Sequence, residues 1–490
     1  MIARILLALG TVALVFFLME SSARIYEGHP PWEGEWKRKK PESLRIGVVG
    51  GSTIWGTPVP ELGFVAQLEA LLPSLAGFRS VDVVNRGKVA ASSRWVRRVG
   101  ADALIEGELD ALLIFSAHNE FLNRSGEDSR WGGLLWEGML HSALVRLTLG
   151  QSESSASLLP ERLDAVDRES TWFDGRLEGY RENLSALIAL ARDRDVPVLL
   201  MTAPVNLADW PPVHHRLGWE HLDSEYETHV REVKALVGAG DLDGAERAID
   251  AWRVLFGEDA MFSYLEGKIA QRRGDVERAA RLFRVAADLD PYPWRALSEQ
   301  NDFIRALAQE KGVTLVDLEG VFAGQARGGL VGFDLIGDNV HPTPLGGALM
   351  ANEAARGLGR AGLPFRAPGK DVVAQLARFR AEQGDRRQKE YIRLMLNGRY
   401  SMKTPFFFYE ISRRYLESAH ALAPEQWMGL ANLGSLALLE GKEQEGLSRL
   451  RRAARLRGEP IDPQERPAVP MLVPALEAAG LPVEAIHASE

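Results

Sequence analysis

The stretch RIGVVGGST at residues 45–53 decides the fold of this chain. Its apolar first half predicts a short buried strand. The glycines that follow predict a tight turn, because glycine tolerates backbone angles that a side chain forbids. A serine hydroxyl on such a turn, here Ser52, is a candidate nucleophile when a base lies nearby. Far downstream, Asp338 and His341 stand three residues apart, close enough for the carboxylate to orient the imidazole ring. The two pieces together indicate a serine hydrolase.

Two further apolar segments, 81–84 and 109–116, predict strands that each end in a polar or glycine-bearing loop. The first runs into Gly87 and the second into Asn119. In open parallel sheets, ligand sites form at the carboxyl ends of the strands. We therefore expect Gly87 and Asn119 to converge with Ser52 on one crevice.

In these four blocks the chain resembles the SGNH/GDSL hydrolase family, which is named for Ser, Gly, Asn and His. The resemblance implies that Ser52 is the nucleophile, His341 the general base and Asp338 the acid that orients it. It also implies an oxyanion hole made by the backbone N–H groups of Ser52 and Gly87 and the side-chain amide of Asn119. Members of this family generally need no metal and no cofactor, so we expect neither here.

Two blocks depart from the usual residues of that family. Gly51 stands where the family has Asp, and residues 117–120 read Ala-His-Asn-Glu in place of Gly-x-Asn-Asp. We interpret the Gly-Gly-Ser form as a mark of a subfamily. His118, beside Asn119, invites a catalytic role; the alternative is a hydrogen bond that holds the loop.

Alternating strands and helices predict an α/β fold, a three-layer α/β/α SGNH-hydrolase sandwich with a mainly parallel sheet. Further elements are expected as a helix at 174–195, a strand at 196–201, a helix at 297–311 and a strand at 313–318. The loop that leaves the strand at 196–201 carries Asn206 and Asp209, a candidate substrate loop, although simple turn chemistry explains these residue types equally well.

Alanine-rich helical segments surround and interrupt this pattern. Gly274 and Asp275, followed by Ala279 and Phe283, resemble the tetratricopeptide (TPR) pattern of paired helices. The predicted organisation is a signal anchor or signal peptide at 1–23, a linker at 24–43, the hydrolase domain at 44–223 and 293–365, inserted TPR-like helices at 224–292, and a C-terminal TPR-like helical domain at 370–490. Such helices bind a protein partner or simply pack against the catalytic domain. Residues 126–150 predict an amphipathic helix, with a lid or a membrane-facing helix as alternatives.

The N-terminus carries an uncharged apolar run from Ile5 to Met19. As a helix it spans roughly 22 Å, somewhat under the ~30 Å hydrocarbon core of a bilayer. We expect a membrane anchor, with a cleaved signal peptide as the alternative. The catalytic domain is then expected on the extracytoplasmic side, in the bacterial envelope. The basic cluster at 37–40 opposes this orientation, because positive flanks tend to stay cytoplasmic.

The charge balance and the cysteine content of the chain limit the partners and the chemistry it can have. The 490 residues hold 58 Lys and Arg against 67 Asp and Glu, a net charge of −9. This balance argues against a nucleic-acid partner, because phosphate binding needs concentrated positive charge. The chain has no cysteine, which excludes disulfides and thiolate nucleophiles.

These observations favour an SGNH-type serine esterase that hydrolyses an O-acyl ester, on an envelope glycan or lipid, through an acyl-Ser52 intermediate. The same site could instead transfer an acetyl group to a polysaccharide, because an acceptor hydroxyl can replace water at that intermediate. A third alternative is a TPR scaffold with a degenerate hydrolase domain. The presence of all five catalytic-block residues favours the enzyme.

Overall fold

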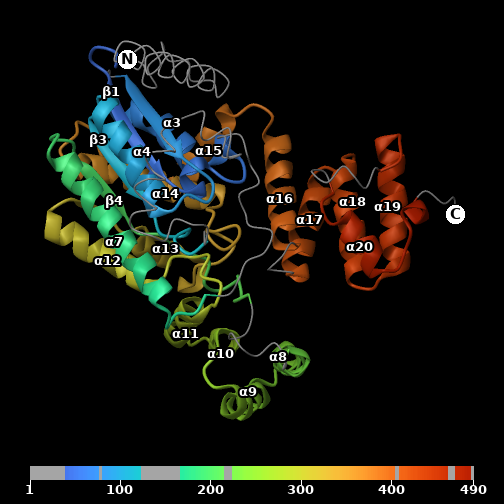
Figure 1. Cartoon of the computed structure of the whole chain (residues 1–490). Coiled ribbons are helices and arrows are strands. Elements are labelled where there is room, and N and C mark those ends of the chain that lie inside the picture. Colours follow the sequence, from blue (N-terminus) through green and yellow to red (C-terminus); the bar gives the residue numbers. More distant parts are fainter. Residues whose placement is uncertain are drawn as a thin grey trace, which may run out of the picture.

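The computed structural model describes residues 39–76, 80–122, 166–213, 223–402, 408–461 and 469–486. Five parallel strands form one sheet in the order β2-β1-β3-β4-β5 (Figure 1). Their bounds are β1 Leu44–Gly50, β2 Val81–Gly87, β3 Ala111–Phe115, β4 Val198–Met201 and β5 Thr314–Val316. The order reverses at β1, so the loops after β1 and β3 leave the sheet side by side, where open α/β sheets place their ligand sites.

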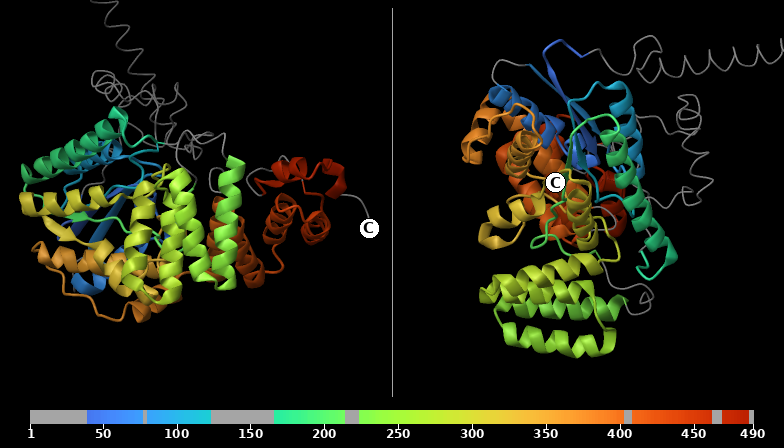
Figure 2. Two further views of the ribbon diagram at one scale, coloured as in Figure 1. Left: turned by 90° about the horizontal axis from the view of Figure 1, so that it is seen from below. Right: turned by 90° about the vertical axis from the view of Figure 1, so that its left-hand side faces the viewer.

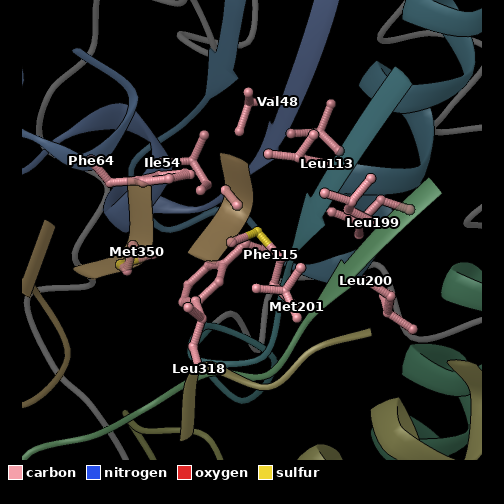
Figure 3. Packing of buried hydrophobic residues seen from close by; sticks show 14 of the residues in the cluster. Val48, Ile54, Phe64, Leu113, Phe115, Leu199, Leu200, Met201, Leu318 and Met350 are labelled. Atoms are coloured by element: carbon pink, nitrogen blue, oxygen red, sulfur yellow. The ribbon is translucent and has the colours of Figure 1, made fainter. Parts of the chain in front are cut away.

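The central strands are almost entirely apolar because helices cover both faces of the sheet. The exception is Arg45 of β1, whose guanidinium bonds Asp82 and the carbonyl of Gly107. Every residue of β1, β3 and β4 is buried. Figure 3 shows side chains of these strands packing with Ile54, Phe64 and Met350, which come from three separate helices. This core fixes the strand ends from which the candidate site projects.

Helices form a layer on each side of the sheet, as the left view of Figure 2 shows. One layer contains α3, α13 and α14, and the other contains α4, α7 and α12. The bounds of the helices in this part of the chain are α2 Ser52–Trp55, α3 Phe64–Ala76, α4 Ser93–Glu106, α7 Thr171–Arg192, α12 Ser298–Lys311, α13 Leu318–Gln325, α14 Pro344–Arg360 and α15 Val372–Glu382, with 3-10 turns at Pro60–Leu62 and Arg327–Gly329. The α/β fold class expected from the sequence is therefore confirmed.

Four helices interrupt the sheet pattern between β4 and α12 and lie below the sheet in Figure 1. They are α8 Asp223–Ala239, α9 Leu242–Phe256, α10 Ala260–Arg273 and α11 Val276–Leu289. A Gly-Asp pair also occurs at 240–241, and it has the same local role as the pair at 274–275: Asp241 caps α9 and Asp275 caps α11 through their side chains. These helices share a hydrophobic core of their own. The likeness to TPRs stays a prediction.

The C-terminal part is also helical, with α16 Arg386–Met402, α17 Tyr409–Leu422, α18 Trp427–Leu439, α19 Glu443–Arg457, α20 Leu472–Ala478 and a 3-10 turn at Val483–Ile486. Two hydrophobic clusters hold these helices together. In Figure 1, α16 is the member of the group that lies nearest the sheet and its covering helices.

The segments expected at 1–23 and 126–150, and the first part of the linker at 24–43, lie outside the described residues. Within the residues that the structure does describe, none of the helices combines the length and the apolar character needed to cross a bilayer.

Candidate active site

The candidate nucleophile lies where β1 meets a one-turn helix. β1 ends at Gly50, and Ser52 is the first residue of α2. Ile54, two residues later in α2, is fully buried in the core, and its carbonyl accepts a hydrogen bond of 2.8 Å from Nδ2 of Asn85. Ser52 itself is 6% exposed. Its hydroxyl therefore sits on a turn anchored both to the core and to the end of β2.

Ser52, His341 and Asp338 form one continuous chain of hydrogen bonds. His341 Nε2 lies 2.7 Å from Ser52 Oγ, and His341 Nδ1 lies 2.6 Å from Asp338 Oδ2. A carboxylate only accepts, so Nδ1 carries the proton and Nε2 presents its lone pair to the serine hydroxyl. This is the tautomer that a general base needs.

The carboxylate of Asp338 is held in its charged form. Its other oxygen, Oδ1, accepts hydrogen bonds from the backbone N–H groups of Val340 at 2.9 Å and His341 at 2.7 Å. Burial alone raises the pKa of Asp338, but His341 and these N–H donors outweigh it, so the pKa lies below its ordinary value. A buried negative charge beside the ring stabilises the imidazolium that forms when His341 takes a proton.

A tight loop presents this acid–base pair. The Gly337 N–H donates to the carbonyl of His341 at 2.8 Å, and Ile336 and Pro342 form an antiparallel bridge on either side. The loop runs directly into α14, which Thr343 caps by accepting a hydrogen bond from the Gly346 N–H. The sequence supports this geometry because Pro344, the first residue of α14, is favoured at that helical position.

Asn119 lies beside the nucleophile turn. Its Nδ2 donates to the carbonyl of Ala91 at 3.1 Å, which uses one of its two amide hydrogens. A Cβ built on Gly51 would stand only 2.5 Å from Nδ2 of Asn119. The Gly-Gly-Ser form thus has a physical reason: with Asn119 in this position, residue 51 has no room for a side chain.

Gly87 lies against the nucleophile turn. Its N–H donates to Oδ1 of Asn85 at 2.9 Å, and a Cβ added to it would stand 2.2 Å from the backbone nitrogen of Trp55. Gly87 therefore packs closely against α2, and its place in the oxyanion hole stays a prediction. The loop after β2 meets Asn119 through Ala91, and the preceding residue, Ala90, is buried with a positive φ of 59°.

His118 has one hydrogen-bonded nitrogen and one unpaired nitrogen. Nδ1 accepts a hydrogen bond from the Ala296 N–H at 3.1 Å, which matches the loop-holding alternative. Nε2 is buried and has no hydrogen-bond partner in the described part of the chain. Burial, helped by the nearby His341, lowers the pKa of His118 to about 3, so its ring is neutral at ordinary pH. The proton then resides on Nε2, beside the candidate catalytic residues.

Asn206 and Asp209 make protein contacts. Asn206 donates from Nδ2 to the carbonyl of Ile336 at 3.1 Å and accepts from the Asp209 N–H at 3.0 Å. Asp209 accepts from the Phe333 N–H at 3.0 Å and pairs with Lys268 of α10 at 3.5 Å. These contacts match the turn alternative, in which the two residues tie the loop after β4 to the acid–base loop.

Two groups of residues near the site carry no signal in the sequence. The buried carboxylate of Glu120 accepts from both the N–H and the hydroxyl of Ser93 at the start of α4, which anchors the Asn119 loop. Asn397 and Tyr415 donate hydrogen bonds to the carbonyl of Gly337 from the C-terminal helices. Glu120 closes the block at 117–120, but its bond to Ser93 has no sequence signal, and Asn397 and Tyr415 belong to no recognisable motif. Among the described residues, no cluster of three or more His, Cys, Asp or Glu side chains is arranged to hold a metal ion.

No protein-family model matches the sequence, and neither does any curated protein. Solved structures do align with the chain. An alpha/beta hydrolase enzyme from the metagenome of Lake Arreo, Spain, is 14% identical, with a TM-score of 0.30 over 66% of this chain and 97% of its own. A catalytic mutant of an acetylxylan esterase from Geobacillus stearothermophilus is 12% identical, with a TM-score of 0.32 over 66% and 97%. A GDSL-like lipase from Bacteroides thetaiotaomicron is 10% identical, with a TM-score of 0.32 over 70% and 99%. At these scores the functional argument rests on the geometry of the site and not on the likenesses.

Proposed function

We propose that this chain is a serine esterase that cleaves an O-acyl ester through an acyl-Ser52 intermediate. The observation that carries the proposal is the unbroken hydrogen-bond chain from Ser52 Oγ through His341 to Asp338. Side chains from two distant parts of the sequence, Ser52 and the pair Asp338 and His341, meet at hydrogen-bond distance with the tautomer that general-base catalysis needs. A scaffold with a degenerate domain has no use for that arrangement.

The reaction follows from the geometry. Ser52 Oγ attacks the ester carbonyl while its proton moves to His341 Nε2, and the negative charge passes to the carbonyl oxygen. The second amide hydrogen of Asn119 and the N–H of Ser52 are the proposed donors to this oxyanion. Collapse of the intermediate expels the alcohol, which takes the proton from His341. Water then attacks the acyl-Ser52 ester in the same way and releases the acid.

We further propose that the substrate is an acyl ester of an envelope glycan or lipid, to which the segment at 1–23 gives access by tethering the enzyme to a membrane. Transfer of an acetyl group to a polysaccharide is the alternative use of the same intermediate. p-Nitrophenyl acetate turnover with and without a glycan acceptor separates the two. An alkaline phosphatase fusion at residue 43 tests the location, because an inactive fusion would place the catalytic domain in the cytoplasm.

The catalytic proposal is tested by labelling the full chain with a fluorophosphonate probe and locating the adduct by mass spectrometry. We expect the adduct on Ser52, and we expect Ser52→Ala to abolish both labelling and p-nitrophenyl acetate cleavage. Ser418→Ala is the matched control, because Ser418 is exposed on α17 and bonds only within its own helix in the described structure. Unchanged cleavage by folded Ser52→Ala protein would remove the proposal.

A further inference from the structure

The residue directly before Asp338 is held by two helices of the C-terminal part. The carbonyl of Gly337 accepts a hydrogen bond of 3.3 Å from Nδ2 of Asn397 in α16, and a second one from the hydroxyl of Tyr415 in α17. The N–H of Gly337 points the other way, to the carbonyl of His341. The C-terminal helices therefore bind the loop that carries the acid–base pair, at the residue directly before Asp338.

Both donors are buried, with 3% of Asn397 and 6% of Tyr415 exposed. A buried amide or phenol without a partner costs free energy, so these contacts define one docking position for the two helices. Burial raises the pKa of Tyr415, to which the nearby Asp338 charge also contributes, and its hydroxyl thus remains a donor at any ordinary pH.

A cluster of aromatic side chains fixes the same helices to the catalytic domain. Tyr400 of α16 stacks on Trp210 of the loop after β4, with ring centroids 6.1 Å apart, and Phe408 meets Trp210 edge-on at 5.3 Å. Tyr415 packs edge-on against Phe333 at 5.7 Å. Tyr400 also makes a long contact, 3.5 Å, with Oδ1 of Asn339, inside the acid–base loop. Packing and hydrogen bonds thus converge on one loop from one direction.

We propose that Asn397 and Tyr415 are positioning residues for catalysis: by holding the Gly337 carbonyl, they keep the Asp338 carboxylate in line with His341 and Ser52. The inference rests on the proposed esterase function. It assigns α16 and α17 to the working hydrolase, because the acid–base loop is not completed by the sheet domain alone. Reacting groups tolerate little displacement, since a 1 Å misplacement costs about 10²-fold in rate.

The test compares three variants of the full chain that each remove one buried polar group. Tyr415→Phe and Asn397→Leu remove the donors to Gly337. Tyr391→Phe is the matched control: Tyr391 is a fully buried tyrosine of α16, and its hydroxyl accepts a hydrogen bond from the Gly429 N–H within the C-terminal helices. All three variants are expected to lower the melting temperature. Only the first two are expected to lower kcat for p-nitrophenyl acetate, by roughly tenfold each and with KM within twofold, and to slow fluorophosphonate labelling of Ser52 to the same extent.

The outcomes are separable. If wild-type protein is labelled at Ser52 but Tyr415→Phe and Asn397→Leu keep the kcat of Tyr391→Phe, the positioning role is wrong and the contacts are only structural. If wild-type protein is neither labelled nor active, the esterase proposal fails and this inference falls with it. Reduced kcat in Tyr415→Phe and Asn397→Leu, together with a kcat closer to wild type in a further variant, Asn397→Gln, supports positioning through the amide.

Discussion

Replacing Gly51 by alanine inserts one methyl group against the amide that we assign to the oxyanion hole. The backbone of Gly51 has φ −83° and ψ −155°, which any residue adopts, so the effect comes from contact alone. The added Cβ would stand 2.5 Å from Nδ2 of Asn119, against the 3.4 Å at which ordinary contact begins. The amide must therefore retreat by roughly 0.9 Å, the difference between these distances, which is comparable to the displacement that costs about 10²-fold in rate.

We expect Gly51→Ala to lower kcat for p-nitrophenyl acetate by about 10²–10³-fold, as loss of one oxyanion donor typically does, or roughly 2.7–4 kcal/mol of transition-state stabilisation. KM should change little, because the donor acts on charge that develops only in the transition state. Gly175→Ala is the matched control. Gly175 is exposed in α7, and an added Cβ has no neighbour within 4 Å, so this variant should keep full activity and gain roughly 0.5–1 kcal/mol in stability.

The effects of Gly51→Ala and Asn119→Ala on kcat should not be additive. Since Gly51→Ala acts by displacing the Asn119 amide, the double variant Gly51→Ala/Asn119→Ala should be no slower than Asn119→Ala alone. If the two losses multiply, Gly51→Ala acts by some route other than Asn119. If Gly51→Ala retains wild-type kcat, the close approach has no bearing on the reaction.

Three further variants test neighbouring residues. Asp338→Asn should lower kcat about 10⁴-fold, as loss of the carboxylate of such a triad does. Because the folded-state pKa of Asp338 is lowered, the charge of Asp338 stabilises the fold above the unfolded pKa of ~3.9, and this stabilisation disappears as the pH falls through the folded value. The difference in melting temperature between wild type and Asp338→Asn should therefore shrink in acid. His118→Asn keeps an acceptor for the Ala296 N–H. Because the folded-state pKa of His118, about 3, lies below the unfolded value of ~6.5, the free energy of unfolding of wild type should fall by up to about 1.4 kcal/mol per pH unit more than that of the variant as the pH drops from 6.5 to 3. Urea unfolding at each pH measures this difference. Equal pH slopes would contradict the buried neutral ring. Asn206→Ala should lower stability by roughly 1–3 kcal/mol with KM unchanged; a large rise in KM at wild-type stability would restore the substrate-contact interpretation.

The parts of the fold that the sequence predicts are those with a local cause. β1 can be predicted because a strand buried on both faces forms a nearly continuous apolar run, here with Arg45 as its one charged residue. Ser52 can be predicted as a candidate nucleophile because the glycines before it mark a tight turn at the end of such a strand. The contact between Asp338 and His341 can be predicted from their spacing of three residues. This spacing lets one carboxylate oxygen reach Nδ1 while the other accepts the backbone N–H of His341.

The role expected for Gly87 stays a prediction, and its N–H bonds Oδ1 of Asn85 in this structure. Glycine is the residue type expected where the chain turns toward the site with a left-handed backbone. In the described structure the residue with that backbone beside Ala91 is an alanine, Ala90. An alanine with positive φ pays a conformational cost that only the surrounding packing imposes, so nothing in its type reveals it. The sequence alone does not predict the role of Asn397 and Tyr415, because that role depends on how α16 and α17 pack against a loop 60 and 78 residues before these two side chains.

These contacts divide the site into two halves that are held mainly by different residues. One segment touches both: the Ala296 N–H donates to His118 beside Asn119, and the Trp294 carbonyl accepts from Asn339. The nucleophile half, Ser52 with Gly51 and Asn119, is built within the first 122 residues and is anchored by Ala91 and Glu120. The acid–base half is supported by the loop after β4 and by the C-terminal helices. A variant in one half should therefore leave the geometry of the other intact.

It follows that Gly51→Ala and Tyr415→Phe should combine multiplicatively in kcat, as independent sites do, within about 0.3–0.5 kcal/mol. The pair Gly51→Ala and Asn119→Ala, inside one half, should not. A double variant Gly51→Ala/Tyr415→Phe no slower than Gly51→Ala alone would mean that Tyr415 acts through the nucleophile turn or not at all, and the separation of the two halves would be lost.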